Sequence, residues 1–389
     1  MQSTAAKLHC LVCWISALLL IDTVDHSILL DRLHVTFGIG GAALGWIRTF
    51  LTARTQQVVY LGSLSSVGQL AFGVPQGSVL GPLLYVLYTA GLFEIIESCG
   101  LTAHSYADDT QVYLSVPASD APLAVNRLTD CIDKIEHWMG CNRLRLNVDK
   151  TQVIWMGTRQ QLEKIGIDEL ILHSSTIQFS KKVVNLGVVL DSQLKMSEQV
   201  SSLCRSCFFQ LRQIRTIRRS LTSDSTKTLV NAFVNSRLDY CNSLLYGVGE
   251  GLMDRLQRVQ NAAARLVSGA KKYDHITPIM MDLHWLPIRR RVTFKVATLV
   301  YKCLHGCAPV YLADDCVAVS SIPGRRFLRS AAHLELTVPR TRTMTSGPRA
   351  FPVCGPRVWN SFPCTLRSPE LSYNCFRKKL KTELFLKSC

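Results

Sequence analysis

Several features that would define common protein classes are missing from this sequence of 389 residues. It has no low-complexity run, and its apolar content of 48% excludes a chain that stays unfolded. Its most apolar stretch, residues 8–21, is too short to span a bilayer and has no small-residue cleavage site after it. We therefore expect this stretch to form a buried strand rather than a signal peptide, and we expect no membrane partner.

Cysteine is plentiful, with 15 residues, but the patterns of a disulfide framework and of a zinc site are both missing. The count is odd, the spacing is irregular, and a core of this size needs no covalent staples. Two CxxC pairs occur, Cys10 with Cys13 and Cys204 with Cys207, and each lacks the second pair that would complete a zinc site. We expect reduced thiols in an intracellular protein, nuclear or cytoplasmic and not secreted.

Acidic residues are scarce in the second half of the chain. Residues 1–200 contain 14 Lys or Arg and 17 Asp or Glu, whereas residues 201–389 contain 30 and 11, so that the net charges are −3 and +19. So uneven a distribution predicts a catalytic or binding core followed by a region that holds a polyanion, with nucleic acid favoured over a membrane surface.

Hydrophobic periodicity predicts an α+β chain with a helical second half. Helix-like segments are residues 27–37, 42–51, 83–92, 120–139, 199–219, 225–236, 253–268 and 289–304. Strand-like segments are residues 56–60, 69–72, 103–106, 111–116, 152–156 and 183–190. In residues 253–268, Arg255, Arg258 and Arg265 lie on a different face from the apolar side chains. The last 70 residues are rich in Pro, Arg and Ser.

The sharpest local feature is Tyr106-Ala107-Asp108-Asp109, between two short strands. Adjacent carboxylates at the tip of a hairpin repel each other unless a cation lies beside them. Aspartate is also common in turns for conformational reasons alone. The apolar strands on both sides favour the first interpretation, a metal-binding turn.

A second feature is the segment GVPQGSVLGPLLY, residues 73–85, in which three glycines and two prolines frame a loop that leads into a helix. Glycine lets a backbone approach a ligand closely, and a helix N-terminus favours anionic groups. Gln76 and Ser78 are candidates to orient a sugar, base or phosphate. A purely structural turn before a helix is the alternative.

Together these segments resemble the nucleotide-positioning and metal-binding motifs of reverse transcriptases of the non-LTR (LINE-type) retrotransposons. The resemblance extends in order along the chain from about residue 22 to its end. The similar segments are DTVDHSILL at 22–30, CNRLRLNVDKT at 141–151, NLGVVLD at 185–191, SRLDYCNSLL at 236–245, LHWLP at 283–287 and VPRTR at 338–342.

This resemblance implies a right-hand polymerase palm, an antiparallel sheet with packed helices, at residues 22–195, with the fingers mostly missing. An atypical apolar segment would precede it at 1–21. A helical thumb-like region at 196–310 and a basic C-terminal region at 311–389 would follow it.

The implied reaction is synthesis of DNA on an RNA template from a DNA primer and deoxynucleoside triphosphates, with two Mg²⁺ or Mn²⁺ ions. Asp108 would be the main metal ligand and Asp109 would assist it. Gln76, Gly77 and Ser78 would lie against the nucleotide, and Lys150 is a candidate to contact or protonate pyrophosphate.

The sequence departs from the family pattern in its first palm motif. If Asp22 is the aspartate that precedes Thr-Val-Asp-His, the metal-binding position six residues earlier is Ser16 and the aromatic position is Ile21. A serine hydroxyl does not replace a carboxylate on hard divalent cations. In the alternative register Asp22 itself enters the metal site and Asp25 takes the place of the second aspartate.

Two functions follow from these observations. One is a working RNA-directed DNA polymerase, and the other is a non-catalytic nucleic-acid-binding remnant that uses the basic region after residue 200. A reading frame with no selected role is a third possibility. The missing carboxylate favours the remnant, so that we expect impaired or absent catalysis.

Overall fold

The protein is described here by a computed structural model that covers residues 7–16, 23–75, 77–107, 109–172, 175–321, 334–341, 343 and 346–386, with residues 7–16 described by their backbone. The chain divides into two compact units, each of which is described by itself. Unit 1 comprises Met1–Val184 with Asp191–Gln193, and unit 2 comprises Asn185–Leu190 with Leu194–Cys389.

A four-stranded antiparallel sheet organises unit 1, with the strand order β6-β7-β1-β8. These strands are β1 (Lys7–Ser16), β6 (Thr102–Tyr106), β7 (Asp109–Pro117) and β8 (Gln152–Trp155). The prediction of a strand in the apolar stretch near the N-terminus is confirmed for the residues described there. β1 lies inside the sheet, because Cys13 pairs with Val112 of β7 on one side and with Val153 of β8 on the other.

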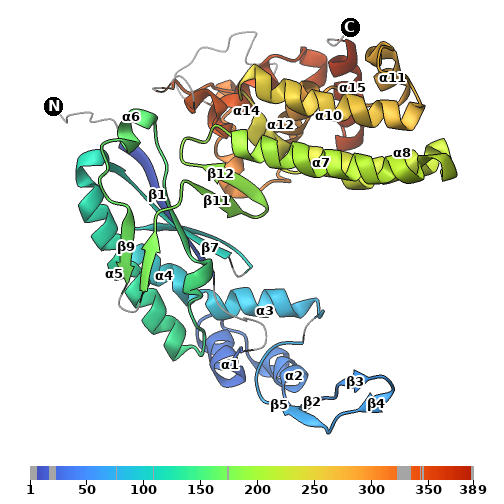
Figure 1. Ribbon diagram of the computed structural model, residues 1–389. Coiled ribbons are helices and arrows are strands. Elements are labelled where there is room, and N and C mark those ends of the chain that lie inside the picture. The colour runs from blue at the N-terminus through green and yellow to red at the C-terminus, as the bar shows by residue number, and fades with distance from the viewer. Residues whose placement is uncertain are drawn as a thin grey trace. The chain divides into compact units, whose positions relative to one another are not determined.

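Helix α5 (Ala121–Cys141) packs on this sheet, as the amphipathic pattern predicts (Figure 1). Leu128, Ile132 and Ile135 are completely buried in the core of unit 1. Gly140 was expected to end the helix, which instead runs one residue further. Arg143 then adopts a positive φ of 54°, which turns the chain out of the helical direction.

Further helices of unit 1 are α1 (His26–Val35), α2 (Gly41–Leu51), α3 (Leu80–Thr89) and α4 (Gly91–Ser98). The short strands β2 (Arg54–Gln56), β3 (Val59–Tyr60), β4 (Ser63–Leu64) and β5 (Gly68–Leu70) pair as β2 with β5 and β3 with β4. They form a hairpin that includes both strand segments predicted in this region, and Leu61 and Gly62 at its tip have positive φ.

The helical segment Leu80–Ser98 has 19 residues and, by length and composition only, is long and apolar enough to cross a membrane. Tyr88 and Ile96 of this segment are completely buried in the core of unit 1, as they are in a core helix. The helix predicted at 83–92 is present, with different ends. It begins three residues earlier, and α4 extends it.

The region after β8 differs from the expectation in two places. β9 (Glu169–Leu172) and β10 (Ser175–Gln178) form a two-stranded sheet that the sequence did not indicate. Periodicity predicted a single strand at 183–190, but the structure has a hairpin there, β11 (Lys182–Asn185) and β12 (Val188–Asp191), as the resemblance of residues 185–191 to a primer-gripping hairpin implies. Leu186 and Gly187 between them have φ of 45° and 79°, values that reverse the chain.

Apart from strand residues of β11 and β12 at its start, the regular structure of unit 2 in its described residues is helical, and the unit holds two apolar clusters. α7 and α10 lie side by side in the first cluster (Figure 1), and α12 packs against α14 and α15 in the second. The helices are α7 (Ser197–Ile217), α8 (Ser223–Val230), α9 (Ser236–Asp239), α10 (Glu250–Ser268), α11 (Ile276–Asp282), α12 (Ile288–Leu304), α13 (Val310–Ala313), α14 (Phe351–Asn360) and α15 (Tyr373–Leu386).

Three of the predicted helices of unit 2 are confirmed as α7, α10 and α12. The fourth, expected as one helix at 225–236, is interrupted. A π-helical turn at Asn231–Asn235 separates α8 from α9. Such turns break the regular ladder and give no periodic signal in a sequence, so the pattern could not reveal it.

Candidate functional site

The acidic turn joins β6 to β7, as expected. Tyr106 pairs with Asp109 at the end of the hairpin, and Ala107 has a φ of 53°. The hydroxyl of Thr110 donates to that of Ser105 at 3.3 Å and ties the two strands together below the turn. Asp109 is half-buried at the first position of β7. Asp108, the predicted main metal ligand, lies outside the described residues.

The strand beside this turn ends at Ser16. In the antiparallel register of β1 and β7, Ser16 pairs with Asp109 and Ile15 pairs with Thr110. Directly opposed residues in such a pair have Cα atoms roughly 4.5–5.5 Å apart. The backbone position next to the acidic turn is therefore occupied by serine. Asp22, the residue of the alternative register, lies outside the described residues.

The glycine-rich loop begins with a fixed contact to the start of α1. Gly73 donates its N–H to the carbonyl of Val24 at 2.8 Å, and the imidazole Nε2 of His26 lies 2.7 Å from the carbonyl oxygen of Gly73. Val24 and Val74 are buried beside these bonds. The segments 22–30 and 73–85, which the resemblance treats as two motifs, therefore form one structural junction.

Within the loop, Ser78 is bound to its own turn. Its hydroxyl donates to the carbonyl of Pro75 at 2.7 Å and accepts from the N–H of Gly81 at 3.0 Å. A Cβ atom at Gly81 would lie 3.1 Å from that hydroxyl, so that the close approach requires glycine. These bonds support the structural interpretation of Ser78, and its contact with a nucleotide stays a prediction.

Gly77 is exposed, with a φ of 79°, and a Cβ atom there would meet nothing within 4 Å. Its backbone is therefore open to solvent in a conformation that other residues rarely adopt. Gln76, the third predicted nucleotide contact, lies outside the described residues. We also expect Gln76 and Asp108 to lie close together, and this stays a prediction because both residues lie outside the described part of the chain.

The carboxylate of Asp25 holds a second junction, which the sequence did not indicate. It accepts from the N–H of Ser27 at 2.9 Å and of Ile28 at 3.3 Å, and so caps α1. It also pairs with the guanidinium Nε of Arg143 at 2.8 Å. The hydroxyl of Ser27, with these donors, holds the pKa of the Asp25 carboxyl below its ordinary value, although burial opposes the shift.

A buried polar cluster continues this junction into the helices. Arg32 of α1 donates to the carbonyl of Tyr88 and, at 2.8 Å, to the side-chain oxygen of Asn142. The hydroxyl of Tyr88 donates to the carbonyl of Asn142 at 2.6 Å, and burial raises the pKa of this tyrosine. The segment 141–151 is thereby attached to α1 and α3. Because the partners lie 54 to 118 residues apart, one sequence gives no signal for these pairs.

Lys150 lies at the end of a short 3-10 turn, Val148–Lys150, that lies against β1. The turn is held by the buried side chain of Asn147, which accepts from the N–H of Lys150 at 3.2 Å. Lys150 itself is exposed. This placement is compatible both with an exposed loop lysine and with contact to pyrophosphate, so that the second remains a prediction.

The described residues by themselves do not form a centre for two divalent ions, and the predicted main ligand Asp108 lies outside them. Such ions take carboxylate oxygens as protein ligands, and the position paired with Asp109 carries a serine. Within the described part of the chain, no three His, Cys, Asp or Glu side chains come together as metal ligands. Asp25 is engaged by a helix cap and an ion pair, so its carboxylate is committed elsewhere.

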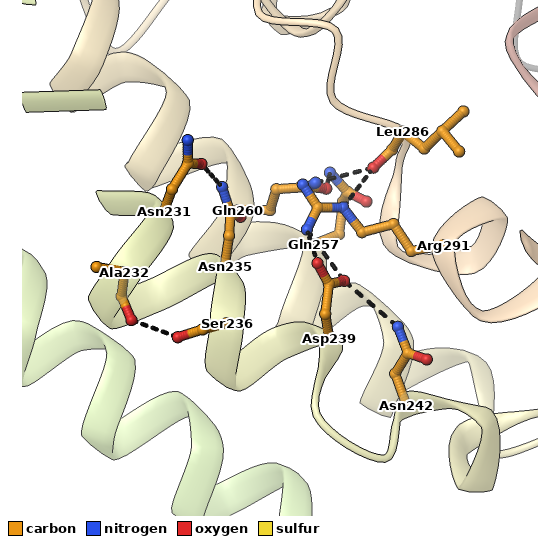
Figure 2. Close-up of polar contacts among 10 residues, drawn as sticks. All are labelled: Asn231, Ala232, Asn235, Ser236, Asp239, Asn242, Gln257, Gln260, Leu286 and Arg291. Carbon is orange, nitrogen blue, oxygen red and sulfur yellow. Dashed lines mark hydrogen bonds and ion pairs between the residues drawn. The ribbon is translucent and has the colours of Figure 1, made fainter. Parts of the chain in front are cut away.

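The C-terminal motifs meet in a polar network of unit 2 (Figure 2). Arg291 binds both carboxylate oxygens of Asp239 at 3.1 Å and donates to the carbonyl of Leu286 at 3.0 Å. Gln260 donates to the same carbonyl at 2.9 Å, and the side-chain oxygen of Gln257 accepts from the N–H of Ile288. The motifs at 236–245 and 283–287 thus fix helices to one another. Of the motif at 338–342, the last residue lies outside the described residues.

Comparison with known protein families matches residues 21–190 to "Reverse transcriptase (RNA-dependent DNA polymerase)". Among curated proteins, the RNA-directed DNA polymerase from mobile element jockey of Drosophila melanogaster is 26% identical over 249 residues, which cover 61% of this chain and 26% of that protein. The probable RNA-directed DNA polymerase from transposon BS of the same species is 24% identical and covers 75% of this chain and 33% of that protein.

This chain therefore spans about a quarter to a third of the length of these relatives. A solved telomerase from Candida albicans, in complex with a fragment of telomeric RNA, aligns with 73% of this chain and 45% of its own at 12% identity and a TM-score of 0.37.

Proposed function

We propose that this chain, whose residues 21–190 match the reverse transcriptase family, binds an RNA template and a DNA primer but transfers nucleotides weakly or not at all. Residues 22–195 would act as the palm with partial fingers, residues 196–310 as a thumb, and residues 311–389 as a basic extension. Such a protein would act inside the cell, where these nucleic acids occur.

One observation carries this proposal, the pairing of Ser16 with Asp109 at the ends of two neighbouring strands. Reverse transcriptases use divalent metal ions, which supply charge neutralisation at the reacting phosphate when bound. In the register that keeps the match from Asp22 through His26, Ser16 occupies the position of a metal-binding carboxylate. The loss of one charged oxygen donor leaves binding of the template possible and impairs the chemistry.

The other residues of the site would position substrates. The loop that starts at Gly73 is fixed to α1 by His26 and Val24, so that the exposed backbone at Gly77 is held in place where a nucleotide could approach. Asp25 would hold Arg143 and the segment after α5 against the same junction. The chain would thus keep the residues that position substrates but lack one of the carboxylates that bind the metal ions.

The decisive experiment restores the carboxylate. Primer extension on an RNA template is measured in Mg²⁺ and in Mn²⁺ for the unaltered protein and for Ser16→Asp. We expect the unaltered protein to extend the primer at or near background and Ser16→Asp to raise the rate by about 100-fold, the typical value of one electrostatic contact at a reacting centre.

Ser16→Asn serves as the matched control, because it has nearly the size of aspartate without the charge, and we expect no gain from it. Asp109→Asn in the Ser16→Asp background should return the rate to background. Robust extension by the unaltered protein would contradict the proposal and favour the register in which Asp22 enters the metal site. The absence of any gain from Ser16→Asp in folded protein would show that the serine is not what limits the reaction.

A further inference from the structure

A strongly basic pocket lies in unit 2. It has a volume of about 670 Å³ and opens where α7 and α10 end. The two helices run in the same direction, since Arg255 near the start of α10 bonds to Ser201 near the start of α7, and Arg218 bonds to Leu266 at the other end. The polar and charged residues that line the pocket are Arg215, Arg218, Arg258, Asn261, Arg265 and Lys272.

Two of these arginines have structural roles. Arg218 donates to the carbonyls of Leu221, Leu266 and Val267 at 3.0 to 3.2 Å, and so satisfies the end of α10. Arg265 donates to the carbonyls of Lys271 and Asp274 at 3.2 Å. Cations that bind the last carbonyls of a helix are common, which explains Arg218, whereas Arg265 binds the loop that follows α10.

Of the other three cations, Arg215 lies in the last turn of α7, where the helix dipole favours a cation, and Arg258 and Lys272 have neither role. Arg215, Arg258 and Lys272 are exposed. None of the five cations forms an ion pair within 4.0 Å with an acidic side chain of the described residues. Elsewhere in unit 2 arginines do have acidic partners, such as Arg291 with Asp239 and Arg289 with Glu250. Five like charges around one pocket repel one another, and an anionic ligand would relieve that repulsion.

The chemistry of the lining favours phosphate. The planar guanidinium group matches the oxygens of a phosphate with two parallel hydrogen bonds, and Asn261 adds a neutral polar group. Tyr273, beside Lys272, is 90% exposed and could stack on a base or sugar at the rim.

The charge also continues along the surface beyond the pocket. Arg212 and Arg219 are exposed; Arg212 lies one turn before Arg215 on α7, and Arg219 lies in the 3-10 turn Arg218–Ser220 that follows the helix. At a rise of about 1.5 Å per residue, Arg212 and Arg219 are separated by roughly 10 Å along the axis. That extent suits successive phosphates of a strand rather than one free phosphate.

We propose that this pocket binds the phosphate backbone of a nucleic acid strand independently of its base sequence. The inference rests on the proposed function in that the strand would be part of the template–primer. The pocket would act as an anchor within unit 2, at a place that none of the motifs resembling the polymerase family includes.

The test compares two double variants of the full chain. Arg215→Gln with Arg258→Gln removes two charges from the pocket, and Lys378→Gln with Lys379→Gln removes two exposed charges from α15. Binding of a fluorescent RNA–DNA hybrid is measured by anisotropy over a series of salt concentrations. Circular dichroism and thermal unfolding verify that both variants fold.

We expect the pocket variant to bind at least about fivefold more weakly near 0.1 M salt and to lower the slope of log affinity against log salt by about 1.5, as the loss of two phosphate contacts requires. The α15 variant should change both quantities much less. Arg215→Lys with Arg258→Lys keeps the charges and should keep most of the slope.

Equal losses of affinity in the two glutamine variants would contradict binding at the pocket. They would indicate that the positive charge of the whole surface binds the hybrid, and the proposed function would still stand. Hybrid binding by the unaltered protein that the pocket variant leaves unchanged would overturn it as well. If the unaltered protein bound vesicles containing phosphatidylserine but not the hybrid, the pocket would belong to a membrane surface, and both proposals would fail. Displacement of the hybrid by inorganic phosphate at matched ionic strength would assign the pocket to a free anion and overturn the backbone contact.

Discussion

The carboxylate of Asp25 makes three kinds of contact within a few ångströms. It caps α1 through the N–H groups of Ser27 and Ile28, accepts from the Ser27 hydroxyl at 2.5 Å, and pairs with Arg143. Its side chain is 10% exposed, whereas that of Arg143 is 64% exposed. The ion pair is therefore screened by solvent on one side, and the cap contributes most of the stabilisation.

Replacement of this residue separates the two contributions. Asp25→Ala removes both the helix cap and the ion pair with Arg143, and it should lower the free energy of unfolding by about 1–2 kcal/mol at pH 7. Asp25→Asn removes the ion pair but keeps a side chain that caps a helix well, and it should lower this free energy by less than about 1 kcal/mol. Urea unfolding followed by circular dichroism measures both. Equal losses in the two variants would show that the ion pair dominates.

The lowered pKa of Asp25 gives this effect a dependence on pH. Because the pKa in the folded state lies below the ordinary value of 3.8, the stabilisation is fully present above that value and is lost as the pH falls through the folded pKa. The difference between the unaltered protein and Asp25→Asn should thus be constant from pH 7 to about pH 5 and shrink below about pH 4. A difference that grew on acidification would contradict this assignment.

In unit 2, the motifs at 236–245 and 283–287 stabilise the packing of the helices against one another. The side chain of Arg291 is 11% exposed, and its guanidinium joins Asp239 at the end of α9 to the turn before α12, as Figure 2 shows. α9 itself follows a π-helical turn in which Asn235 donates to the side chain of Asn231 at 2.7 Å. These residues act on packing, and sequence resemblance alone did not distinguish that role from contact with nucleic acid.

Removal of Asp239 should therefore destabilise unit 2. Asp239→Ala leaves the nearly buried Arg291 without its carboxylate and should cost about 1–3 kcal/mol, a range lowered because Asp239 is 51% exposed. Glu250→Ala is the matched control, because it breaks the pair with Arg289, which is exposed on both sides, and it should destabilise the protein much less. Thermal unfolding monitored by circular dichroism compares them. Equal costs would mean that the network adds nothing beyond a surface pair.

At the scale of the whole molecule, the uneven distribution of charge is the dominant property. The net charge is +16, and all of the excess comes from residues after 200, which form helical unit 2. A charge field of this size raises the local concentration of a polyanion and accelerates its association. The basic pocket concentrates part of that field at one place.

The salt dependence of binding checks this property for the unaltered chain. Affinity for an RNA–DNA hybrid should fall linearly on a log–log plot, by about 100-fold between roughly 50 and 200 mM salt if about four phosphates are contacted. Electrophoretic mobility shift or anisotropy titrations give the slope. Binding that ignores ionic strength would contradict a role of the basic unit in holding nucleic acid.

Much of the secondary structure could be predicted from the sequence. α5, α7, α10 and the hairpin of β6 and β7 have strong periodic patterns or clear turn signals, and all are present. β9 with β10, and α15, were not predicted. The strands are only four residues long, and α15 lies in a region whose Pro, Arg and Ser content suggested irregular structure. Local patterns this short or this mixed are decided by packing.

The family, the order of its motifs and the excess of positive charge were determined by the sequence itself, because each is a property of residues adjacent or ordered along one chain. The tertiary structure decided which of those residues meet. It brought Ser16 beside Asp109, His26 to Gly73, Asp25 to Arg143, and five cations around one pocket. Contacts between residues so far apart depend on strand register and helix packing, which no local pattern specifies.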